Sequence, residues 1–94
     1  MRFEWDIRKS RSNLTKHGIT FELAEIIFFD PLSRTMPDRE VNGEKRWITL
    51  GTLPNGRVLF VAHTLTGSDE EPVVRIISAR KATIHERREF EEDS

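Results

Sequence analysis

Residues 46–65 of the chain are RWITLGTLPNGRVLFVAHTL, two β-prone segments joined by Pro54-Asn55-Gly56. Val, Leu, Phe and Thr dominate residues 57–65, and such residues favour a pleated, half-buried strand. Proline, asparagine and glycine are typical of tight turns, so we predict antiparallel strands over 46–53 and 57–65. A short turn between adjacent strands implies antiparallel pairing, so this hairpin is the starting point for the predicted fold class.

Outward from the hairpin, residue patterns predict further strands over 2–5, 32–36 and 73–80, with a polar loop over 37–45 and an acidic loop over 66–72. Asp6 is placed to cap a helix over 7–17 that ends at Gly18. Thr20 is placed to cap a second helix that Asp30-Pro31 ends. Thr83 and Glu86 match the capping box of a last helix that ends near residue 91. We therefore predict an α+β fold of order βααββββα in one domain over 1–94, with a mainly antiparallel sheet and helices on one side.

The first predicted helix is poor in apolar residues. Ile7 and Leu14 are its expected core contacts, while Lys9, Asn13 and Lys16 share another face at helical spacing. We expect that face to be polar and positive, with Asn13 making a structural hydrogen bond.

Charge is unevenly distributed although the formal net charge is only −1. Segments 1–18 and 46–81 carry +3 and +2, whereas segments 19–45 and 82–94 each carry −3. A folded chain with this alternation either presents a basic face or a mixed, solvated surface. There is no cysteine and no apolar run of membrane-spanning length, so we expect a cytoplasmic protein without disulfides or membrane contact.

RNA cleavage without a metal needs cations for the phosphate and side chains that move protons. Arg46 and Arg80 are our strongest phosphate-binding candidates, because an arginine fork donates two hydrogen bonds. The alternative for Arg80 is a salt bridge to an acid in 86–92. Lys9 or Lys81 is expected to assist in holding the phosphate, and further RNA contacts are expected from Lys16, Arg57 and Arg75.

Candidate proton carriers are His63, Glu44 and His17, with His85 a further option. For His63 a hydrogen-bonded, partly buried structural role is equally compatible with the sequence, whereas for Glu44 the sequence favours a surface charge over a base. His17 alternatively stabilises the end of its helix. The histidines show no close metal-ligand spacing and no nucleotide-binding motif is present, so we expect no metal and no cofactor.

Two segments of the chain resemble the BrnT toxins. The first is Trp5-Asp6-x-x-Lys9-x-x-x-Asn13-x-x-Lys16-His17-Gly18, and the second is the run 76–83, IISARKAT, followed by Glu86-Arg87 and Phe90-Glu91. Between them, Gly43-Glu44-x-Arg46-Trp47 and Leu50-Gly51 are also similar to the family. Tyrosine is common in the family where Phe90 stands here.

The resemblance implies a RelE-like ribonuclease toxin of a type II toxin–antitoxin system that arrests growth by cutting RNA. It implies neutralisation by a BrnA-like antitoxin with a ribbon-helix-helix domain, and contact with DNA only through that antitoxin. It also implies a homodimer within the toxin–antitoxin complex. The alternative is a catalytically inactive module that binds nucleic acid or antitoxin and acts as a co-repressor.

Overall fold

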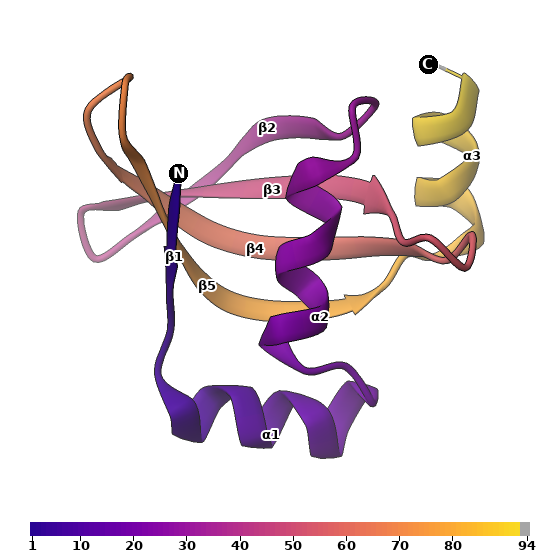
Figure 1. Ribbon diagram of the computed structural model, residues 1–94, viewed down its shortest axis with the longest axis horizontal. Coiled ribbons are helices and arrows are strands. Elements are labelled where there is room, and N and C mark those ends of the chain that lie inside the picture. The colour runs from indigo at the N-terminus through magenta and orange to yellow at the C-terminus, as the bar shows by residue number, and fades with distance from the viewer. Residues whose placement is uncertain (93–94) are drawn as a thin grey trace.

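The computed structural model describes residues 1–92, which form a five-stranded sheet and three α-helices (Figure 1). In chain order the elements are β1 (Arg2–Glu4), α1 (Ile7–His17), α2 (Phe21–Glu25), the 3₁₀ helix η1 (Ile26–Phe29), β2 (Arg34–Val41), β3 (Glu44–Thr52), β4 (Val58–Gly67), β5 (Pro72–Lys81) and α3 (Ile84–Glu92). The strand order is β1-β5-β4-β3-β2, and β1 pairs with β5 in parallel while the other neighbours are antiparallel. The predicted α+β fold is confirmed. Within residues 1–92, no helix has the length and apolar character needed to cross a membrane.

The main core lies between the sheet and the α2–η1 segment, which crosses one face of the sheet in Figure 1. Thr20 caps α2 as predicted, since its hydroxyl accepts a hydrogen bond from the Leu23 N–H at 3.1 Å. Burying each large apolar side chain of this core contributes about 1.5–3 kcal/mol. The helical side supplies Ile19, Phe21, Ala24 and Ile27, and the strands supply Leu59, Val61, Val74, Ile76 and Ala79.

The expectation that all helices lie on one side of the sheet is wrong for α3. Phe90 of α3 packs against Ile48, Leu50 and Val58, in a second buried cluster. Val58 and Leu59 are neighbours in β4 and belong to different clusters, because successive strand residues point to opposite faces. The second face of the sheet is therefore apolar at one end, and α3 covers it there.

Polar contacts hold α1 in place, which corrects the prediction that Ile7 and Leu14 are its core contacts. Those two side chains are 55% and 48% exposed, whereas Ser10 and Asn13 are buried. Ser10 Oγ accepts a hydrogen bond from the Phe21 N–H at 3.3 Å. The predicted caps are confirmed: Asp6 accepts from the Arg8 N–H, and Gly18 adopts the left-handed conformation with φ of 70°.

The predicted loop over 37–45 is wrong, because β2 continues to Val41 and joins β3 through a two-residue turn. Asn42 and Gly43 have φ values of 53° and 79°, the left-handed conformations that a tight hairpin turn requires. Asparagine and glycine tolerate such values better than other residues. The predicted turn at Pro54-Asn55-Gly56 is confirmed, and the Leu53 N–H donates to the Arg57 carbonyl at 2.8 Å.

Gly51 of β3 lies directly against Ile27 of η1. A Cβ at this position would lie 2.7 Å from the Ile27 carbonyl oxygen and 2.8 Å from Ile27 Cβ. We expect Gly51→Ala to lower the free energy of unfolding by about 1–3 kcal/mol, because the backbone must shift to relieve the overlap. Urea denaturation measures this. Arg88→Ala, on the exposed face of α3, is the control and should change stability by less than about 0.5 kcal/mol; equal stability of the two variants would contradict the packing.

Candidate functional site

A basic pocket of about 440 Å³ lies where β5 ends, between the β3–β4 turn and the start of α3. It brings together two cations predicted from the sequence, Arg57 and Lys81, and a third that the prediction missed, Arg87. Arg87 was detectable in principle, since it follows one helical turn after the capping residue Thr83 and so lies near Lys81. The other lining residues are Asn55, Gly56, Val58, Ala82 and Ile84.

A second pocket, of about 240 Å³, lies between α1 and β5. We call it the α1–β5 pocket. It brings together the predicted residues Lys9 and Lys16 and also His17. The remaining lining residues are Ser12 and Asn13 of α1 and Ile77 and Ser78 of β5.

Asn13 positions α1 against β5. Its Nδ2 donates to the Ile19 carbonyl at 2.8 Å and to the Ala79 carbonyl at 2.7 Å, and its Oδ1 accepts from the Ala79 N–H at 3.1 Å. β1 pairs with β5 only from Val73 to Arg75, so Ala79 lies on a stretch of β5 that β1 does not reach. The carboxamide therefore bonds to the strand as a neighbouring peptide group would. The predicted structural hydrogen bond of Asn13 is confirmed.

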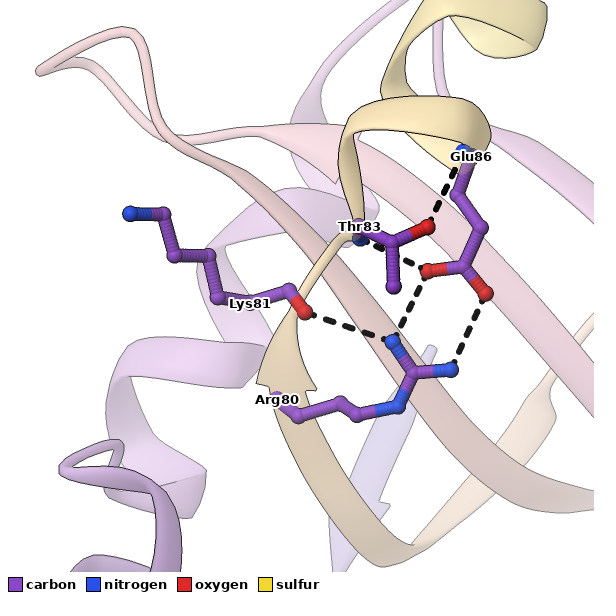
Figure 2. A network of polar contacts seen from close by, with 4 residues as sticks. All are labelled: Arg80, Lys81, Thr83 and Glu86. Carbon is purple, nitrogen blue, oxygen red and sulfur yellow. Dashed lines mark hydrogen bonds and ion pairs between the residues drawn. The ribbon is translucent and has the colours of Figure 1, made fainter.

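Arg80 is bound to Glu86 in a bidentate ion pair (Figure 2). Its two terminal nitrogens lie 2.8 and 2.9 Å from the Glu86 oxygens, and its guanidinium stacks 3.9 Å from the centre of the Phe60 ring. Hydrogen bonds from Arg80 are the main reason that the pKa of Glu86 falls to about 2, and the same pairing raises the pKa of Arg80. Glu86 also accepts from the Thr83 N–H, which completes the predicted capping box.

This pairing is the alternative considered for Arg80, and it argues against the predicted phosphate contact. The fork that would grip a phosphate is occupied by a carboxylate and fastens α3 to the end of β5. Lys81, the next residue, extends away from Glu86 in Figure 2 and lines the basic pocket instead.

His63 is fully buried, with 0% of its surface exposed, under η1 and against the Phe28 ring. Its Nδ1 lies 3.1 Å from the Thr64 carbonyl and its Nε2 lies 2.7 Å from Thr49 Oγ1. A carbonyl only accepts, so Nδ1 donates and Nε2 accepts from the Thr49 hydroxyl, whose oxygen is 2.7 Å from Thr35 Oγ1. Desolvation lowers the pKa of His63. Burial and two satisfied nitrogens argue against the predicted proton transfer to RNA.

The other predicted residues lie toward the opposite end of the sheet. Glu44 is exposed at the start of β3 and Arg75 forms an ion pair with Glu4 at 3.6 Å. Arg46 is half-buried, with an Nε that has no hydrogen-bond partner.

The structure thus does not gather Arg46, Arg80 and Lys9 around one cleft. Arg80 of β5 lies opposite Phe60 of β4, and Phe60 lies opposite Leu50 of β3. Arg46 precedes Leu50 by four residues, a separation of about 13 Å along the strand. Lys9 lies on α1, in the α1–β5 pocket.

Cation-lined pockets such as the two around the end of β5 are typical of the class of small proteins that bind nucleic acid. Residues 5–86 match the family described as "Ribonuclease toxin, BrnT, of type II toxin-antitoxin system", and the chain therefore belongs to the BrnT family. The family predicted from the sequence is confirmed.

The fold agrees with this membership. The chain is similar to the crystal structure of the Brucella abortus ribonuclease toxin, BrnT, at 25% sequence identity and a TM-score of 0.69. The match covers 88% of this chain and 97% of that one. No curated protein sequence matches the chain.

The buried histidine predicts a pH-dependent stability. A folded-state pKa below the usual value of about 6.5 means that the unfolded chain binds a proton more readily. The stabilisation is therefore complete above pH 6.5 and declines as the pH falls below it, by at most about 1.4 kcal/mol per pH unit. The pKa of Glu86 is lowered from 4.5 to about 2 in the folded protein, so Glu86 contributes to the loss of stability only below about pH 4.5.

Urea denaturation between pH 7 and pH 5 isolates the His63 contribution. The control is the double variant His17→Gln/His85→Gln, which removes the two exposed histidines and should keep the decline. His63→Gln should flatten it, and an NMR titration of the His63 ring in the unaltered protein gives a second measurement if that variant does not fold. A flat stability profile for the unaltered protein would rule out a buried, neutral His63.

Proposed function

We propose that this protein is a toxin that acts as a metal-independent endoribonuclease and leaves a 2′,3′-cyclic phosphate. Membership of a ribonuclease toxin family supports this, together with the observation that carries the proposal: two cation-lined pockets flank the last residues of β5. In such cleavage the 2′-oxygen attacks phosphorus, the bond to the 5′-oxygen breaks, and negative charge builds up on the phosphate.

The basic pocket provides the phosphate contacts in this proposal. Arg57 and Arg87 carry planar forks that match phosphate oxygens, and Lys81 adds a compact positive charge. Arg87 also pairs with Glu91 at 2.8 Å, an exposed pair that a phosphate exchanges at little cost. Lys9 and Lys16 provide positive charge in the α1–β5 pocket.

The proposed partners follow from the family. A type II toxin is neutralised by a protein, and we propose a BrnA-like antitoxin with a ribbon-helix-helix domain. Contact with DNA is then indirect, through that antitoxin, and the toxin forms a homodimer within the complex in the cytoplasm.

A second candidate is a catalytically inactive module that binds nucleic acid or antitoxin as a co-repressor. The structural engagement of Arg80 and His63 favours it, since both residues were catalytic candidates in the sequence.

The two candidates differ in whether RNA is cut. We expect antitoxin-free protein to cleave RNA in excess EDTA and to leave ends that carry a cyclic phosphate, identified by mass spectrometry of the products. An active BrnT toxin serves as the positive control. Intact RNA in a preparation that binds RNA would favour the co-repressor, and cleavage that EDTA abolishes would overturn metal independence.

Charge removal in the basic pocket should weaken RNA binding without unfolding the chain, because Arg57 and Lys81 are both exposed. With a 2′-O-methyl RNA, which resists cleavage, we expect the Arg57→Ala/Lys81→Ala variant to bind more weakly. Its slope of log affinity against log salt should be smaller by about 1.4, at about 0.7 per lost phosphate contact on a single strand. Arg39→Ala/Lys45→Ala removes the same charge near the opposite end of the sheet and is the control. Equal salt slopes for the two variants would contradict this assignment.

A further inference from the structure

The α1–β5 pocket combines an imidazole, two ammonium groups and two hydroxyls in one depression. These come from His17, from Lys9 and Lys16, and from Ser12 and Ser78. Imidazole is the side chain that most readily transfers protons near neutral pH. The basic pocket, by contrast, contains cations and no residue of this kind among its lining side chains.

The three histidines of the chain, all within residues 1–92, have different surroundings. His63 is buried and hydrogen-bonded through both nitrogens. His85 is exposed on α3, and its Nε2 lies 3.0 Å from Glu89 Oε1. His17 is exposed and lines a cationic pocket, so it alone combines access to solvent with a place beside candidate phosphate ligands.

The position of His17 is fixed by its neighbours along α1. It follows Asn13 by four residues, and residues at this spacing share a helix face. Asn13 is bonded to the Ala79 backbone, so this face is held against β5. Gly18 ends the helix immediately afterwards, so His17 belongs to the last turn of α1.

We propose that His17 is a catalytic residue that donates a proton to the 5′-oxygen leaving group in the α1–β5 pocket, an inference that rests on the proposed ribonuclease function. The 2′-oxygen forms its bond to phosphorus and releases its proton to solvent water. The bond between phosphorus and the 5′-oxygen breaks with its electron pair on oxygen, and that oxygen takes the proton from the His17 imidazolium.

The groups that share the pocket with His17 support this role. Lys9 and Lys16 are its charged groups, both on α1, and they stabilise the additional negative charge of the transition state. β5 contributes the hydroxyl of Ser78 and the side chain of Ile77, neither of them charged. No carboxylate belongs to the lining, so nothing there competes with a phosphate for the ammonium groups.

The test compares His17→Gln with the unaltered protein on two substrates. The first is an RNA oligonucleotide that contains one mapped cleavage site, and the second replaces the 5′-bridging oxygen at that site with sulfur. A thiolate leaves without protonation. We expect His17→Gln to lower kcat on the natural RNA by about 10²- to 10⁴-fold, as for other general acids, with little change in KM. On the sulfur substrate its rate should approach that of the unaltered protein.

His85→Gln, which removes a histidine from outside the pocket, is the matched control and should keep full activity on both substrates. Full activity of His17→Gln on natural RNA, or an equal loss on both substrates, would overturn the role of His17 as the acid while the ribonuclease function stands. An unaltered protein that cuts neither substrate would overturn the proposed function itself. Since His17 is exposed, its variant should keep the thermal unfolding temperature; His17→Asn provides the same comparison if the glutamine variant does not fold.

Discussion

The hydrogen bonds between the Asn13 carboxamide and the Ala79 backbone hold α1 against β5, and the arrangement of the α1–β5 pocket depends on this contact. Pairing of β1 with β5 stops at Arg75, and a sheet edge left open beyond that point would attract other chains. One side chain that both donates and accepts satisfies the Ala79 peptide groups and holds α1 in register with β5. A polar residue, rather than an apolar stripe, therefore docks the helix that lines one side of the α1–β5 pocket.

A second polar contact, the ion pair between Arg80 and Glu86, joins the end of β5 to α3. Arg80 turns toward Glu86 and the Phe60 ring, while Lys81 turns the other way and lines the basic pocket. Alternation along a strand makes this division natural, because adjacent residues point to opposite faces. The bidentate pair is partly exposed, so its contribution to stability is modest; its consequence is geometric, since it fixes the first turn of α3 and with it Arg87.

The sequence predicted those features that depend on contacts between residues close together along the chain. The caps at Asp6, Thr20 and Thr83 were placed correctly, because each cap is a bond over two or three residues. The buried face of α1 was not predicted, since hydrophobic periodicity gives no weight to a buried Ser10 or Asn13. The extension of β2 was also missed: Pro37 and the charged residues after it are typical of a loop, and an edge strand tolerates the same residues.

The sequence supplied candidate residues for the two pockets, but it could not show which of them line a pocket. His63 was a candidate proton carrier in the sequence, but the position of β4 between β3 and β5 and the cover of η1 decide that it is buried. What the sequence did contain was the charge pattern. Cations of its two basic segments meet around the end of β5, while the acidic loop Asp69–Glu71 lies at the opposite end of the sheet (Figure 1). A chain with a net charge of −1 thereby places five cations around two pockets, a local concentration of positive charge that the total charge does not reveal.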